Sequence, residues 1–96
     1  METRFAPDAE RVLEHLEDND PDAADAVWDV IEMVAADPGS ALARRRSLRT
    51  LGGHTVWAVP IPMISDEPWL LLWQQQTPDE ILVAYVGPAD FRPWKM

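Results

Sequence analysis

Arginines form the main basic cluster of this sequence. Residues 38–53 contain no acidic residue and four arginines, Arg44, Arg45, Arg46 and Arg49. Because a guanidinium group binds phosphates and carboxylates through paired hydrogen bonds, the cluster is a candidate site for an anion, a nucleic acid or an acidic partner peptide. The interpretation that we favour is pairing within the chain, since residues 1–37 hold 12 acidic residues against 2 arginines.

A histidine lies close to this cluster. His54 follows Gly53, at the start of a segment rich in strand-forming residues, and imidazole is the side chain best suited to act as a general base near neutral pH. A lone histidine in a turn is usually only solvated. We therefore name no catalytic residue beyond His54 as a weak candidate.

Acidic residues recur along the segment 22–32 at helical spacing. A helix would place them on one face, where a cation could bind, but no histidine joins them and hard cations prefer preformed loops. The sequence also lacks cysteine, so it offers no thiolate ligand, disulfide or cysteine nucleophile. We expect a solvated acidic face, no metal and no cofactor. The four residues are Asp22, Asp25, Asp29 and Glu32.

Length, composition and charge limit the classes of protein to which this chain can belong. The 96 residues suit a single domain spanning 1–96, and 47% hydrophobic residues exclude disorder. We expect a cytoplasmic protein without a membrane partner, because no apolar run approaches the length of a membrane span. The net charge of −9 opposes general nucleic-acid binding. That charge is concentrated, at −10 in residues 1–37, +4 in residues 38–53 and −3 in the remainder.

The acidic part predicts two antiparallel helices. Apolar residues recur with a period near 3.6 in residues 12–16 and again in residues 24–35. Pro7 suits the first turn of the first helix, and Asp20 followed by Pro21 is typical of a cap and a restart. The short connection favours antiparallel packing of the two helices.

The second half predicts strands at 55–61, 68–74 and 81–86, and residues 2–5 could add a short edge strand. A turn at 77–79 joins the last two strands as an antiparallel hairpin. Pro60 and Pro62 lack N–H groups on the same edge, so this end of the strand must lie at a border of the sheet. The order strand–helix–helix–strand–strand–strand predicts an α+β fold, with both helices packed on a small, mainly antiparallel sheet.

Tryptophans and an apolar tail mark candidate surfaces for a partner. Both faces of the segment 69–73 are apolar, which predicts burial on both sides. In so small a domain, the second cover could be the C-terminal tail, a second copy or a partner. The candidate contact residues are Trp57, Trp69, Trp73, Phe91 and Trp94, and the tail adds Arg92 and Lys95 as further candidates for an anion or a partner.

Several motifs, taken in order, resemble the RelE/ParE superfamily of toxins from type II toxin–antitoxin modules. Arg4–Leu13 is similar to the strand-into-helix entry of that family, with Ala6 in place of the usual capping serine. The passage 36–59, with its D-P, L, G and W-x-V elements, is similar to the stretch before the central strands. Trp69–Trp73 matches the Y-R-V-L-Y strand, and Ile81–Val86 matches the last apolar strand. The resemblance covers nearly the whole chain.

The departures from the family concern its ribonuclease site. In ribonucleolytic members, the resemblance implies an arginine in the Y-R-V-L-Y strand, where this chain has Trp69 or Leu70. It also implies an arginine and a tyrosine after the last strand, where this chain has Pro88 and Phe91. Metal-free cleavage of RNA needs positive charge on the developing oxyanion and an acid–base pair, which these residues do not supply.

The sequence therefore predicts a toxin-family protein that acts by binding a protein rather than by cleaving mRNA. The expected partner is a cognate antitoxin or a second copy of the chain, and resemblance to ParE-like members implies DNA gyrase as a target. The first alternative is a ribosome-dependent mRNA endoribonuclease that uses a rearranged basic site, with RNA or the ribosome as partner. The second alternative is a non-toxic acidic domain for dimerisation or interaction.

Overall fold

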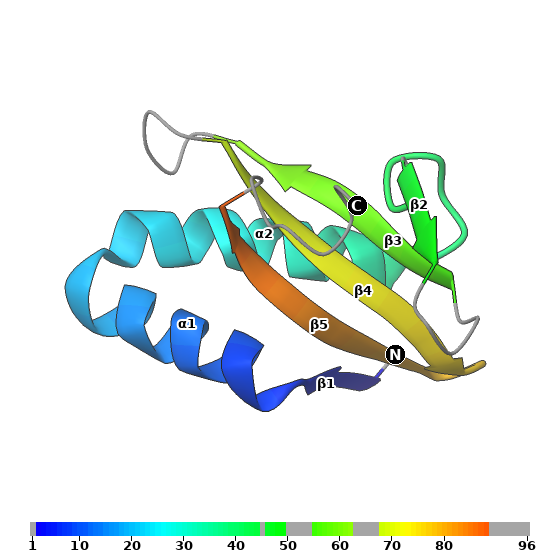
Figure 1. Ribbon diagram of the computed structural model, residues 1–96, viewed down its shortest axis with the longest axis horizontal. Coiled ribbons are helices and arrows are strands. Elements are labelled where there is room, and N and C mark those ends of the chain that lie inside the picture. Colours follow the sequence, from blue (N-terminus) through cyan, green and yellow to red (C-terminus); the bar gives the residue numbers. More distant parts are fainter. Residues whose placement is uncertain (1, 45, 50–54, 63–67, 89–96) are drawn as a thin grey trace.

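Two helices cover one face of a five-stranded sheet (Figure 1). The computed structural model describes residues 2–44, 46–49, 55–62 and 68–88, with backbone alone at 46, 48 and 49. The elements are β1 (Glu2–Phe5), α1 (Pro7–Asn19), α2 (Pro21–Ala36), β2 (Arg46–Arg49), β3 (Thr55–Ile61), β4 (Trp69–Thr77) and β5 (Glu80–Pro88).

The sheet has the strand order β1-β5-β4-β3-β2. Strand β1 is parallel to β5, and the other neighbours are antiparallel. The predicted α+β architecture and the predicted edge strand at residues 2–5 are confirmed. Strand β2 is an addition, because no strand was expected in the basic segment.

The helix ends follow the residues that cap them. Ala6 has the extended backbone of an N-cap residue, with φ −64° and ψ 148°, but makes no side-chain cap to α1. Asp20 ends α1 through its N–H, which donates to the carbonyl of Leu16 at 2.7 Å. The Asp20 side chain then accepts from the N–H of Ala23 at 3.3 Å and caps α2. One residue thus closes one helix and opens the next, which holds the helices as a hairpin.

The main core lies between the helices and the sheet. Leu71 and Trp73 of β4 are fully buried there in one cluster with residues of both helices and with Ile81 and Val83 of β5. The Trp73 indole N–H donates to the carbonyl of Ala43 at 2.8 Å. This hydrogen bond satisfies the polar atom of the largest core residue and ties the segment after α2 to the centre of the sheet.

A second apolar cluster covers the other face of the sheet, and we call it the open-face cluster. It contains Val56, Ala58, Leu70 and Leu72, all less than 9% exposed, with Ala84 and Tyr85 packed against them. The prediction that β4 is buried on both faces is confirmed.

The border predicted at Pro60 is also present. Among the described residues, strand β2 pairs with β3 from Thr55 to Ala58, whereas β4 continues to pair with β3 as far as Ile61. Pro60 is opposite Leu70 in that register and has no N–H to donate. Its nitrogen therefore lies along the edge that β2 leaves uncovered.

The capping pattern predicts opposite effects of two substitutions. Ala6→Ser should raise the free energy of unfolding by about 1 kcal/mol, because the backbone at residue 6 already has the cap conformation. Asp20→Ala should lower it by about 1 kcal/mol, because the α2 cap is lost. Urea denaturation followed by circular dichroism measures both changes. Asp18→Ala, at an exposed position of α1, is the control and should change stability by less than about 0.5 kcal/mol. Equal effects of D18A and D20A would contradict the capping assignment.

Candidate functional site

The resemblance implies a phosphate-binding arginine at Trp69 or Leu70, and of these two positions Leu70 belongs to the open-face cluster while Trp69 packs with the main core. Leu70 is 8% exposed and lies in register between Pro60 and Gly87. No buried polar or charged residue is present among the described residues. The centre of the open face therefore cannot stabilise a phosphate, since an anion desolvated against aliphatic side chains has no compensating charge.

Tyr85 packs on this face, and the sequence patterns did not indicate it as a site residue. Strand β5 bulges where Leu72 is opposite Tyr85 while the next residue, Trp73, is opposite Val83. The bulge leaves Ala84 as an extra residue, and both Ala84 and Tyr85 pack against the open-face cluster. A bulge depends on the pairing of two strands, so the alternation of residues along one strand carried no signal of it.

Tyr85 lies over the backbone of Gly87. Its hydroxyl donates to the carbonyl of Pro88 at 3.0 Å. A Cβ at residue 87 would lie 2.5 Å from the Tyr85 oxygen and 2.8 Å from Cζ. Only glycine leaves room for this ring, so the end of β5 depends on the pair Tyr85 and Gly87.

A groove runs between α1 and the open face. It has a volume of about 370 Å³ and is mostly apolar, with the carboxylate of Asp8 on the α1 side. Asp8 pairs with Arg11 one turn further along the helix. The groove continues the open-face cluster toward the helices, and its lining residues include Ala9, Val12, Val56, Leu72, Ala84 and Tyr85.

Arg44 is the one member of the arginine cluster whose side chain the structure describes. Its Nε donates to the carbonyl of Pro38 at 2.8 Å, and its guanidinium lies 5.1 Å from the centre of the Trp57 ring. A longer contact of 3.4 Å reaches Oε1 of Gln75. No ion pair joins Arg44 to an acid among the described residues, so the favoured interpretation, pairing with the acidic helices, is wrong for Arg44.

The other basic candidates and the histidine are not tested. Arg46 and Arg49 belong to β2, opposite Ala58 and Thr55 in the register. The remaining candidates lie outside the described residues: Arg45, His54, Phe91, Arg92, Trp94 and Lys95.

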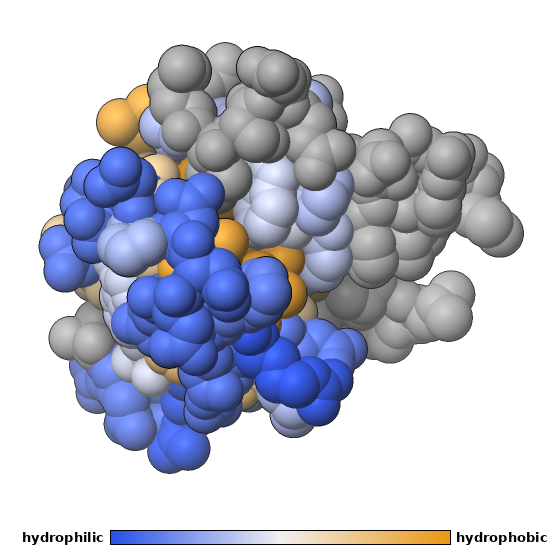
Figure 2. All heavy atoms as spheres, turned by 90° about the vertical axis from the view of Figure 1, so that its left-hand side faces the viewer, coloured by the Kyte–Doolittle hydropathy of each residue, from blue (hydrophilic) through white to orange (hydrophobic). Residues whose placement is uncertain are grey.

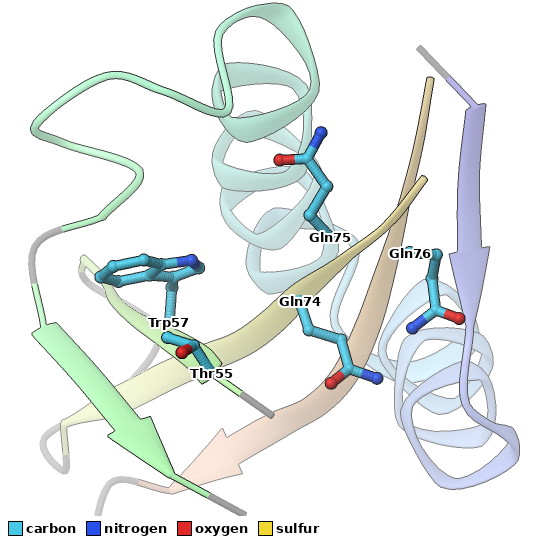
Figure 3. A pocket seen from close by; sticks show the side chains of 5 residues that line it. All are labelled: Thr55, Trp57, Gln74, Gln75 and Gln76. Carbon is cyan, nitrogen blue, oxygen red and sulfur yellow. The ribbon is translucent and has the colours of Figure 1, made fainter. Parts of the chain in front are cut away.

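Trp57 lines a polar pocket beside Arg44, shown in Figure 3. The pocket has a volume of about 430 Å³ and is formed by Thr55 and Trp57 of β3 with Gln74–Gln76 of β4. Gln75 points to the side of the strand opposite Gln74 (Figure 3), and its amide donates to the carbonyls of Thr77 and Pro78 at 3.2 and 3.5 Å. The run of three glutamines, Gln74–Gln76, is the signal in the sequence that could have indicated this polar pocket.

The other two candidate contact tryptophans that the structure describes differ in their access to a partner. Trp69 is half-buried against the main core, and its buried Nε1 has no hydrogen-bond partner among the described residues. Trp73 is fully buried within the domain. The prediction that Trp73 contacts a partner is corrected, because its ring fills the space between β4 and the helices.

The remaining charges lie at the periphery. Arg4 of β1 pairs with Glu80 at 2.8 Å and with Glu2 at 3.4 Å. The hydrogen bond and the charge of Glu80, followed by the charge of Glu2, raise the pKa of Arg4 above its usual value. No group of three or more histidine, cysteine or acidic residues able to hold a metal occurs within the described ranges. In the same part of the chain, no helix combines the length and apolar character that crossing a membrane requires.

Comparison with known proteins identifies the fold. No family model matches the chain, and no curated protein matches it in sequence. Among solved structures, the YoeB/ParE toxin from Agrobacterium tumefaciens is similar, with a TM-score of 0.71 at 13% identity. The alignment covers 92% of this chain and 98% of that toxin. The chain therefore has the RelE/ParE-like toxin fold that its motifs predict.

The contact between Tyr85 and Gly87 predicts that a methyl group at position 87 is costly. Gly87→Ala should lower the free energy of unfolding by about 1–3 kcal/mol, because the ring or the strand must move. The matched control is Gly39→Ala, where a Cβ would meet only Asp37 Oδ1 at 3.7 Å. G39A should be neutral or slightly stabilising.

A double-mutant cycle identifies the cause. In a Tyr85→Leu background, Gly87→Ala should cost less than half as much, since the overlapping ring is absent. An equal cost in both backgrounds, measured by urea denaturation, would show that Tyr85 does not impose the glycine.

Proposed function

We propose that this chain is a RelE/ParE-like toxin-family protein of a type II toxin–antitoxin module, and that it acts by binding a protein rather than by cleaving mRNA. The fold supports the family assignment. The distribution of chemical groups over the two faces of the sheet supports the mechanism.

One observation carries the mechanism. Tyr85 packs with the open-face cluster, whereas Arg44 stacks on Trp57, which packs with the main core on the opposite face. Cleavage of a phosphodiester needs a cation and a proton-transfer group within hydrogen-bond reach of the same phosphate. Because the sheet separates the guanidinium from the phenol, these two groups cannot serve one reaction centre.

The contacts that the Tyr85 hydroxyl and the Arg44 guanidinium already make also favour binding over catalysis. The Tyr85 hydroxyl already donates its proton to the carbonyl of Pro88. Arg44 is held by the carbonyl of Pro38 and by the Trp57 ring. On the open face, Leu70 occupies a position where the resemblance implies an arginine. The mostly apolar groove between α1 and the open-face cluster suits a protein side chain better than a nucleic-acid backbone.

The proposed partners are a cognate antitoxin, which would neutralise the protein, and a cellular protein target. Resemblance to ParE-like toxins makes DNA gyrase the first target to test. A homodimer is the alternative for an apolar surface on so small a domain.

Induction of the protein alone in a bacterial host tests the proposal. We expect growth arrest with intact transcripts by 5′-end mapping, and induction of a DNA-damage reporter if the target is gyrase. Arg44→Ala and Tyr85→Phe should still arrest growth, because neither removes an apolar contact surface. Gly39→Ala is the control for protein level.

Two results would overturn the proposal. Codon-specific cuts in mRNA that disappear in the R44A or Y85F protein would show a nuclease with a rearranged site. Normal growth at full protein level would instead favour a non-toxic interaction domain.

A further inference from the structure

An apolar groove lies between α2 and the end of β3, away from the open face. It has a volume of about 340 Å³. Helix α2 contributes Ala26, Val30 and Met33, and β3 and the turn after it contribute Pro60 and Pro62. The three helix residues are spaced i, i+4, i+7, so they form one continuous stripe along the groove.

Leu42 stands at this groove with 64% of its surface exposed. It is the one large hydrophobic residue that is exposed among the described residues. An exposed leucine beside a concave apolar surface is the arrangement expected of an anchor that is buried by a partner.

An acidic stripe follows the groove along α2. Asp29 lines the groove itself. Asp29 belongs to a set of four exposed acidic residues with the spacing i, i+3, i+7, i+10. This set lies directly beside the apolar stripe on the surface of α2. The stripe consists of Asp22, Asp25, Asp29 and Glu32. Figure 2, which looks onto the end of the molecule where α1 joins α2, shows mostly hydrophilic residues there, with a few apolar residues between them.

The backbone at the groove disfavours an added strand. Within the described ranges, β2 pairs with β3 no further than Ala58, and Pro60, two residues on, has no N–H to offer an added strand. An extended peptide needs alternating donors and acceptors along such an edge. A helix satisfies its own backbone and needs only side-chain contacts, so a helix fits this groove better.

The charges disfavour a second copy of the chain. Two copies that met through this groove would oppose their acidic stripes, and like charges across an interface are repulsive. A helix with a basic stripe beside an apolar stripe would complement both features, as in helix pairs whose flanking charges select the partner.

We propose that the groove between α2 and β3 binds an amphipathic helix that carries lysine or arginine along one edge of its apolar side. This inference rests on the proposed function, since it specifies the chemistry of a protein partner. Leu42 is the apolar anchor, and Asp29 pairs with a cation of the bound helix.

The first experiment uses a synthetic peptide of about 14 residues, built from leucine at helical spacing and lysine elsewhere. Fluorescence anisotropy measures its affinity for the intact protein. A second peptide, with glutamate in place of lysine, keeps the apolar side and reverses the charge. We expect the lysine peptide to bind at least about tenfold more tightly.

Variants then locate the binding surface. Leu42→Ser should weaken the lysine peptide about tenfold, and Asp29→Lys by a similar factor. Both positions are exposed, so the fold should be kept. The matched control is Asp18→Lys, which makes the same charge change on the exposed surface of α1 and should alter affinity less than about twofold.

Three outcomes would overturn the inference. An equal effect of D18K and D29K would mean attraction by the net charge alone. Unchanged binding by L42S would exclude the groove. A dimer seen by light scattering and lost in L42S would assign the groove to a second copy. None of these outcomes bears on growth arrest with intact transcripts, so the proposed function and this inference fail separately.

Discussion

The burial of β4 on both faces is the constraint on which the rest of this molecule depends. Leu71 and Trp73 must be buried from water on one face of β4, and Leu70 and Leu72 must be buried on the other. The helices supply the first cover, and the Trp73 hydrogen bond to Ala43 brings the chain that follows α2 onto the sheet. Strands β3 and β5 pair with β4 on either side. The centre of the sheet is therefore apolar on both faces, and the polar and charged side chains of the described strands lie toward its ends and edges.

This constraint separates the charges of the molecule. The acidic residues gather on the exposed surfaces of α1 and α2, where water screens their repulsion. Arg44 stacks on Trp57 and makes no ion pair with an acid in the part of the chain that the structure describes. The result is a toxin-like fold whose described surface offers apolar grooves with acidic rims. This surface, together with the net charge of −9, is the basis of the proposed binding of a protein rather than a nucleic acid.

Local signals were reliable wherever the physical cause was local. The Asp20-Pro21 pair predicted the break between the helices, because a cap and its helix are neighbours in the chain. Alternation in residues 69–73 predicted burial on both faces of β4. Strand β2 was missed, since its three polar residues and one leucine carry no strand pattern and become a strand by pairing with β3. The same reason hid the contact of Tyr85 with Gly87, which arises from a bulge between two strands.

By itself, the sequence determined the fold class, the helix ends and the segregation of charge, because each depends on residue type and on spacing along the chain. Only the tertiary structure decided which side chains meet. It placed Arg44 on Trp57 rather than on the acidic helices, buried Trp73 away from any partner, and left Leu42 exposed beside α2. These outcomes depend on the packing of segments distant in the chain, where burial and pairing outweigh local preference.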